Sequence, residues 1–182
     1  FRDLSLSLSI GNIYGLLGQN GVGKTTLLKL MSGLLKSDQE TCTVNGCHPY
    51  KRKPDFLQDI YFLPEEPACP LGTVAHFAQN NGSFYPSYDK EYFYELLDRF
   101  EVDPEKRFRD LSAGQLKKAY VSYALALNTK ILLLDEPSNG MDIPSKTVFR
   151  SIVSGQINEG RLIVISTHQV RDLENLIDPI II

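Results

Sequence analysis

Residues 18–25 read Gly18-Gln19-Asn20-Gly21-Val22-Gly23-Lys24-Thr25, which fits the phosphate-loop pattern G-x-x-x-x-G-K-[ST] at every position. The apolar run at residues 13–17 predicts a strand before this loop, and the apolar spacing at residues 27–31 predicts a helix after it. Glycines let backbone N–H groups curl around phosphate oxygens without a Cβ clash, and the helix N-terminus adds partial positive charge. The alternative is an ordinary glycine-rich turn between a strand and a helix.

The loop pattern predicts a role for each of its polar residues. We expect Lys24 to reach the β- and γ-phosphates of a nucleotide and to assist catalysis, and Thr25 to offer its hydroxyl to Mg²⁺. The residues expected to bind the nucleotide here are Gly18, Asn20, Gly21, Gly23, Lys24, Thr25 and Thr26.

A second candidate site lies where the apolar run at residues 131–134 ends in Asp135 and Glu136. Buried strands seldom end in two carboxylates, because burying a charge is unfavourable unless a partner compensates it. At a nucleotide site Mg²⁺ compensates it, so we expect Asp135 to hold the metal and Glu136 to act as general base on the attacking water. The alternative is a surface turn with solvated acids.

A third segment, Leu111-Ser112-Ala113-Gly114-Gln115, resembles the LSGGQ signature of ABC-type ATPases, with Ala113 in place of the first glycine. An isolated match of this kind would only cap a helix. Here it lies after the phosphate loop and shortly before the acidic strand end, and this order makes nearly the whole chain similar to an ABC ATPase domain. The resemblance implies that Ser112, Gly114 and Gln115 bind ATP held by a second subunit, most simply in a homodimer.

The same resemblance assigns three further residues. Asp142, in residues 138–142, matches the acid of the family's D-loop, and His168 matches the switch histidine that contacts the γ-phosphate. Glu65, in the segment Leu63-Pro64-Glu65-Glu66-Pro67, stands where the family usually has a glutamine, and it is expected to bind Mg²⁺ and nucleotide through oxygen. The aromatic residue that stacks on adenine in this family is expected before Phe1.

The order of predicted elements indicates an α/β fold, a P-loop core with a mostly parallel sheet. Strands are expected at residues 13–17, 60–63, 131–134 and 162–165. A partial antiparallel β lobe is expected from residues 4–10 and 40–44, and an inserted helical lobe at about 66–127, with helices at 73–79, 90–100 and 114–127. The chain is read as a single domain, residues 1–182, trimmed at both ends.

The composition of the chain limits the kinds of molecule that it is expected to bind. The net charge is −3, which gives no reason to expect nucleic acid as a partner. The basic run at residues 51–53 is interpreted as a solvated loop, and Cys42, Cys47 and Cys69 as reduced thiols. Since no apolar run approaches the roughly 20 residues of a membrane span, any membrane role requires a separate transmembrane subunit.

The LPEEP segment at residues 63–67 resembles the ATPase subunits of bacterial multidrug and antibiotic-resistance exporters. The resemblance implies hydrolysis of Mg–ATP that drives export through a transmembrane permease, at the cytoplasmic face of the membrane. The aromatic stretch at residues 84–93 is either a docking surface or core packing. One alternative is a soluble ABC ATPase acting on ribosomes or DNA. Another is an ATP sensor without turnover, which an intact Glu136 and His168 disfavour.

Overall fold

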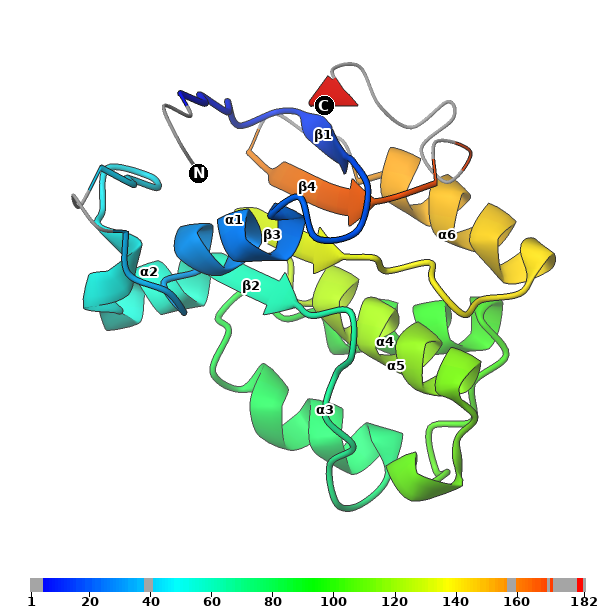
Figure 1. Ribbon diagram of the computed structural model, residues 1–182. Coiled ribbons are helices and arrows are strands. Elements are labelled where there is room, and N and C mark those ends of the chain that lie inside the picture. The colour runs from blue at the N-terminus through cyan, green and yellow to red at the C-terminus, as the bar shows by residue number, and fades with distance from the viewer. Residues whose placement is uncertain (1–4, 38–40, 157–159, 170, 172–179, 182) are drawn as a thin grey trace.

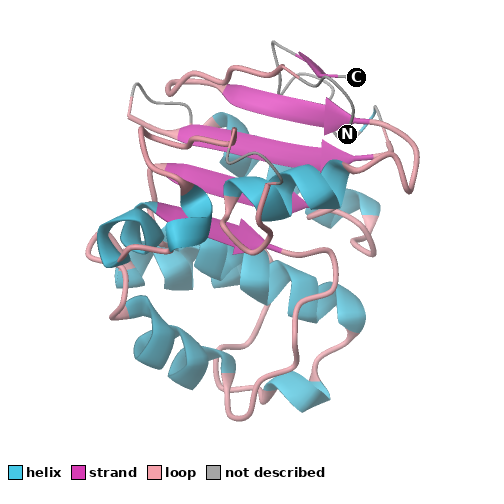
Figure 2. Ribbon diagram, turned by 60° about the vertical axis from the view of Figure 1, so that its left-hand side comes forward, coloured by secondary structure: helices cyan, strands magenta, loops and turns pink. Residues whose placement is uncertain are grey.

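The computed structural model describes residues 5–37, 41–156, 160–169, 171 and 180–181. Its strands form one parallel sheet in the spatial order β2-β3-β4-β1-β5 (Figures 1 and 2). They are β1 (Ile13–Leu17), β2 (Ile60–Leu63), β3 (Ile131–Asp135), β4 (Leu162–Thr167) and β5 (Ile180–Ile181). Because the strands are parallel, the segments that follow β1, β2, β3 and β4 leave the sheet at the same edge.

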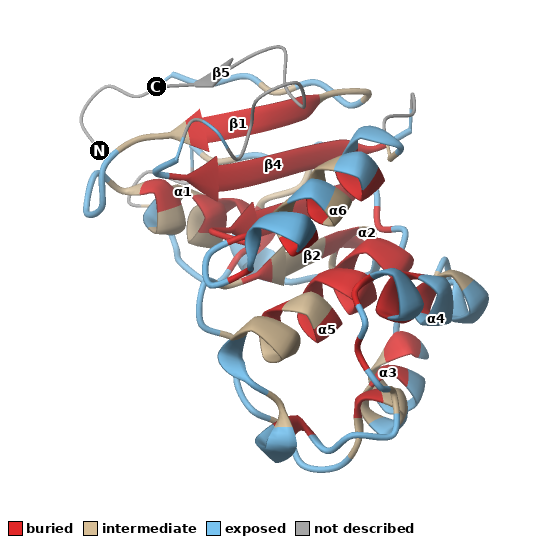
Figure 3. Ribbon diagram, turned by 90° about the vertical axis from the view of Figure 1, so that its right-hand side faces the viewer, coloured by how far each residue is buried: buried red, intermediate tan, exposed pale blue. Residues whose placement is uncertain are grey.

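Helices cover both faces of this sheet. They are α1 (Lys24–Met31), α2 (Pro54–Asp59), α3 (Val74–Gly82), α4 (Lys90–Arg99), α5 (Ala113–Ala126) and α6 (Ile143–Ser154). Alternate residues of β3 divide between two cores: Ile131 and Leu133 pack with α1 and α2, whereas Leu132 and Leu134 pack with α5 and α6. This two-sided burial explains why β3 is apolar at successive positions. Its neighbours β4 and β1 are drawn as buried in Figure 3.

The predicted helical lobe is present, and its helices begin where polar caps stand. Thr73 accepts a hydrogen bond from the His76 N–H at the start of α3, and Asp89 accepts one from Tyr92 N–H at the start of α4. Most rings of the stretch 84–93 pack inward; Phe93 is 1% exposed. Phe84, which is 70% exposed, is the clear exception.

The expected antiparallel β lobe does not form in the described residues. Residues 5–9 and 41–43 have no strand structure, and near them only an isolated bridge joins Val44 to Cys47 around the Asn45–Gly46 turn. A single amphipathic strand needs a neighbour to satisfy its backbone groups, and no described segment supplies one. The expected strand positions Leu4 and Glu40 lie outside the described residues.

Two shorter features were not predicted. The 3₁₀ turn η1 (Pro49–Lys51) overlaps the basic run at Lys51, and helix α2 begins directly after that run; the side chains of residues 51–53 are exposed as expected. A second 3₁₀ turn, η2 (Phe108–Asp110), precedes α5. None of the helices in the described ranges is long and apolar enough to cross a bilayer.

Candidate active site

The phosphate loop joins β1 to α1 and has the backbone shape that its glycines allow. Gly21 (φ 85°) and Gly23 (φ 109°) both have left-handed backbone, which side chains with a Cβ adopt at a penalty. Lys24 begins α1 and is 8% exposed. Its ammonium donates to the carbonyl oxygens of Gly18 (2.6 Å) and Gln19 (3.1 Å), so the cation lies over the loop that would hold phosphates.

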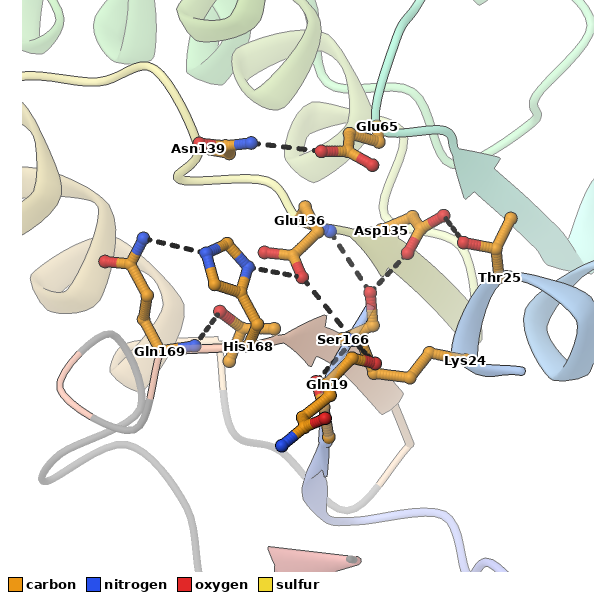
Figure 4. Close-up of polar contacts among 12 residues, drawn as sticks. Gln19, Lys24, Thr25, Glu65, Asp135, Glu136, Asn139, Ser166, His168 and Gln169 are labelled. Atoms are coloured by element: carbon orange, nitrogen blue, oxygen red, sulfur yellow. Dashed lines mark hydrogen bonds and ion pairs between the residues drawn. The ribbon is translucent and has the colours of Figure 1, made fainter. Parts of the chain in front are cut away.

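Three side chains converge at the ends of β3, β4 and α1 (Figure 4). The Thr25 hydroxyl donates to Asp135 Oδ2 at 2.6 Å, and the Ser166 hydroxyl donates to Asp135 Oδ1. Asp135 is 1% exposed, so these two bonds compensate a buried carboxylate. A hydroxyl beside a carboxylate supplies hard oxygen ligands that suit Mg²⁺, which usually takes one or two protein oxygens and completes its shell with phosphates and water. Within the described ranges no three His, Cys, Asp or Glu side chains gather as a metal site of their own.

Glu136 is held by its backbone and by two neighbouring cationic or protonatable groups. Its φ of 44° is unusual for a residue with a Cβ, and its N–H donates to the carbonyl (3.1 Å) and hydroxyl (3.2 Å) of Ser166. Its Oε1 lies 2.9 Å from His168 Nδ1 and 3.7 Å from Lys24 Nζ. The three residues predicted to be catalytic therefore meet around one buried carboxylate, and Gln169 contacts the far nitrogen of His168 at 3.2 Å.

Glu65 follows β2 and lies beside this acidic edge (Figure 4). Its Oε1 accepts a hydrogen bond from Asn139 Nδ2 at 3.0 Å, and its carbonyl accepts one from the ammonium of Lys117. Burial lowers the pKa of Lys117, while the carboxylates of Glu65, Asp135 and Glu136 act in the opposite direction. The predicted metal ligand Glu65 thus lies on the same side of the sheet as the predicted metal ligands Thr25 and Asp135, with its side chain hydrogen-bonded to Asn139.

The predicted signature residues form the start of α5. Ser112 Oγ accepts from Gln115 N–H, and Gln115 Oε1 accepts from Ser112 N–H, both at 3.2 Å. A Cβ at Gly114 would lie 3.1 Å from the Gly140 carbonyl oxygen, so the signature packs against the D-loop of its own chain. No hydrogen bond between described residues joins the signature to the phosphate loop of the same chain.

Asp142, predicted to bind nucleotide from the D-loop, caps α6. It accepts a hydrogen bond from Ser145 N–H at 2.8 Å, and it pairs with Lys118 at 3.4 Å. Hydrogen bonds from Ser145 and the nearby Lys118 ammonium lower the pKa of Asp142 to about 2. Tyr14, the one aromatic residue near the phosphate loop in sequence, is in the sheet core, and its hydroxyl accepts from Ser9 N–H.

Sequence reasoning missed Ser166, Asn139 and Lys117. Ser166 could have been found, because it is a polar residue at the end of an apolar strand, like Asp135, and the parallel register places the two side by side. Asn139 and Lys117 give no such signal, since an asparagine in a turn and a lysine on a helix are ordinary on a protein surface.

Comparison with known proteins agrees with this geometry. The ABC transporter family matches residues 1–139. The ATP-binding protein YtrB of Bacillus subtilis is 32% identical over 96% of this chain and 60% of its own length. NatA of the same organism is 32% identical over 99% of this chain and 76% of its own length. A Pyrococcus furiosus protein described as an ABC transporter ATP-binding protein superposes with a TM-score of 0.77 at 29% identity, over 91% of this chain and 82% of its own. The chain thus spans less than two thirds of YtrB. Together with the phosphate loop, the acidic strand end and the signature, these matches establish that the chain belongs to the ABC transporter family, as an ATP-binding domain of the type that binds ATP with Mg²⁺ and hydrolyses it.

Proposed function

We propose that the protein containing this domain hydrolyses Mg–ATP to drive export of a substrate through a partner membrane subunit. The observation that carries the proposal is that Lys24 and His168 both lie beside the buried carboxylate of Glu136, next to the hydrogen-bonded pair of Thr25 and Asp135. An ATP sensor that binds ATP without hydrolysing it would have no need of this arrangement. The matching relatives named as ABC transporter ATP-binding proteins support a transport role.

The residues of the site divide the chemistry between them. The phosphate-loop N–H groups and Lys24 would bind the β- and γ-phosphates of ATP. Thr25 and Asp135 would hold Mg²⁺, with Glu65 as a further oxygen ligand, and the metal would neutralise charge on the phosphates. Glu136 would orient the attacking water and accept its proton, while His168 fixes the direction of the carboxylate.

A second copy of the domain would complete each site. The signature residues Ser112 and Ala113 are exposed at the N-terminus of α5, where free backbone N–H groups favour an anion. In a two-fold dimer the same surfaces meet twice, so two ATP molecules would each lie between one phosphate loop and one signature.

A groove of about 550 Å³ is the proposed contact with the membrane subunit. It lies between α2, β2 and α3, and its lining includes the exposed side chains of Leu34 and Phe84 and the cation Arg52. Tyr61 and Phe62, also in the lining, precede the Glu65 loop by three or four positions, so a subunit seated there would act close to the active site. Export as the direction rests on the LPEEP segment.

The test is phosphate release by the full-length protein in the presence and absence of Mg²⁺. Lys24→Ala should abolish ATP binding or turnover, and Lys130→Ala, an exposed lysine paired with Asp59, should not. Normal turnover by Lys24→Ala would refute the site. Co-expression with a multi-span membrane protein, sought among the neighbouring genes, should give a complex whose ATPase rate changes with transported substrate; a complex with ribosomes instead would refute transport.

A further inference from the structure

The Glu65 loop is attached to α5 by two side chains. Lys117 donates to the Glu65 carbonyl, and the Tyr120 hydroxyl donates to the Ala68 carbonyl at 2.8 Å. The two donors are three residues apart on α5 and therefore lie on one face of the helix. Both donor side chains are buried, Lys117 at 6% exposure and Tyr120 at 6%, whereas Glu65 and Ala68, whose carbonyls accept the bonds, lie in an exposed segment.

The loop has few other ways to hold its shape. Pro64 and Pro67 have no N–H group, so residues 64–68 supply fewer backbone donors than an ordinary segment of that length. The Glu65 side chain is held separately by Asn139 at 3.0 Å, from the loop after β3 (Figure 4). The position of the Glu65 carboxylate thus depends on α5 through its backbone and on the D-loop through its side chain.

Burying the Lys117 ammonium is unfavourable unless negative groups surround it. The carboxylates of Glu65, Glu66, Asp135 and Glu136 all act on it favourably, and they belong to the acidic edge where ATP and Mg²⁺ would bind. Any buried lysine ammonium needs such compensation, and here the compensating groups are the carboxylates of the acidic edge, which places Lys117 against the candidate site. Its place between the signature helix and this edge indicates a role in the reaction.

We propose that Lys117 is a positioning residue for Mg–ATP hydrolysis, which fixes the Glu65 loop to α5 so that the Glu65 carboxylate stays beside the Thr25–Asp135 pair. The inference rests on the proposed function, because Glu65 matters only if Mg–ATP binds here. It also links the signature to the metal, because α5 starts with Ser112 and Gly114 and holds the Glu65 loop one turn later. A displacement of α5 must therefore move Glu65 or break both bonds.

The experiment measures the Mg²⁺ dependence of the full-length protein in two ways: the Mg²⁺ concentration for half-maximal ATP turnover, and the Mg²⁺-dependent fluorescence change of bound MANT-ATP. Lys117→Met keeps the aliphatic stem and removes the donor, and it should raise the half-saturating Mg²⁺ by about tenfold or more. Lys117→Arg, which keeps charge and donor, should restore most of the response. Lys90→Met, an exposed lysine on α4 of the same lobe, should match wild type. Binding of MANT-ATP in EDTA should be unchanged throughout.

A double-mutant cycle separates positioning from a general structural role. If Lys117 acts through Glu65, then Lys117→Met should add little to the defect of Glu65→Ala, because no carboxylate remains to be positioned. The proposal would be overturned if the increase in half-saturating Mg²⁺ in the double variant equalled the product of the increases in the two single variants. It would also be overturned if a folded Lys117→Met behaved like Lys90→Met. If circular dichroism shows that Lys117→Met does not fold, Lys117→Gln is judged by the same criteria. A wild-type protein that binds MANT-ATP with Mg²⁺ yet never hydrolyses ATP would refute the proposed function alone, since the fluorescence cycle still reports on Lys117.

Discussion

Two consecutive residues, Asp135 and Glu136, show how one strand end can supply two kinds of carboxylate. Asp135 is in extended backbone and its oxygens receive hydroxyls from Thr25 and Ser166. Glu136 turns into left-handed backbone at φ 44°, which directs its side chain toward Lys24 and His168 instead. The carboxylate of Asp135 therefore has hydroxyl neighbours that could share a metal ion with it, whereas the carboxylate of Glu136 lies beside a lysine and a histidine, as expected for a general base.

Glu136 is the predicted general base. Glu136→Gln keeps the shape of the side chain and removes its ability to accept a proton, so ATP affinity should persist while turnover falls by roughly 10²–10⁴. Phosphate release measures the loss, and light scattering should detect a dimer that ATP stabilises. Glu105→Gln, the same change at an exposed position, is the control. A fall of less than about tenfold would mean that another group is the base.

Glu65 is a carboxylate at a position where the family usually has glutamine. Glu65→Gln should retain ATP turnover in the isolated domain, because an amide oxygen can still accept from Asn139 Nδ2 and can still face the metal. Steady-state rates at several Mg²⁺ concentrations measure this. If turnover disappeared at every concentration, the negative charge itself would be required, and the assignment of this position from the family pattern would be wrong.

The helices begin at polar capping residues that are close in sequence to the groups they bind. The packing of the loops depends instead on contacts between segments that are distant in sequence. Four helices begin with a side chain that accepts a hydrogen bond from the backbone N–H three positions later; the capping residues are Thr73, Asp89, Ser112 and Asp142. Gly33 is different: beyond the end of α1, its missing side chain leaves room for the carbonyl of Pro49 in η1, which a Cβ would approach to 2.2 Å.

Gly33→Ala and Gly46→Ala form a matched pair that tests this contact. Their φ angles are nearly equal, 74° and 72°, but nothing lies within 4 Å of a Cβ at Gly46. Gly46→Ala should lower the free energy of unfolding by about 1 kcal/mol for the left-handed backbone alone. Gly33→Ala should lower it by about 1–3 kcal/mol more, because backbone must move. Urea denaturation compares them; equal losses would show that η1 shifts freely.

For the whole molecule, the proposed function requires two copies of the domain to complete each ATP site. The phosphate loop and the predicted catalytic residues meet within one chain, whereas the structure shows no hydrogen bond between the described signature residues and that phosphate loop. If ATP binds between two copies, a lesion in each half should complement in a mixed dimer. Ala113 is the better signature position to alter, because it is exposed, whereas a side chain at Gly114 would press on Gly140.

Mixing full-length Lys24→Ala and Ala113→Arg subunits should restore activity that neither has alone. Random exchange makes half the dimers mixed, and each mixed dimer has one intact site, so the mixture should reach about a quarter of the wild-type rate if sites act independently. Exchange is verified with two affinity tags. A mixture no more active than the better mutant would exclude independently acting shared sites, and crosslinking of ATP to the signature of the opposite chain would then decide whether the sites are shared at all.

The sequence by itself determined the features that depend on residues close together in the chain. Unbroken apolar runs predicted the buried parallel strands, and apolar spacing predicted the helix after the phosphate loop, and both predictions were confirmed. The spacing of glycines and a lysine at residues 18–25 predicts nucleotide binding, which stays a prediction. The predicted antiparallel lobe was wrong in the described residues, because alternation at positions 4–10 cannot tell whether a partner strand lies alongside.

Only the tertiary structure decided which distant groups meet. Three hydrogen bonds join residues that are far apart in the sequence. Ser166 donates to Asp135 across 31 residues, Asn139 donates to Glu65 across 74, and Lys117 donates to the Glu65 carbonyl across 52. No local pattern encodes such contacts, since each depends on strand register and on how α5 packs beside the sheet. Ser166 and Asn139 reach the candidate site because the parallel strands have their carboxyl ends at one edge of the sheet, and Lys117 reaches it because α5 packs against β2.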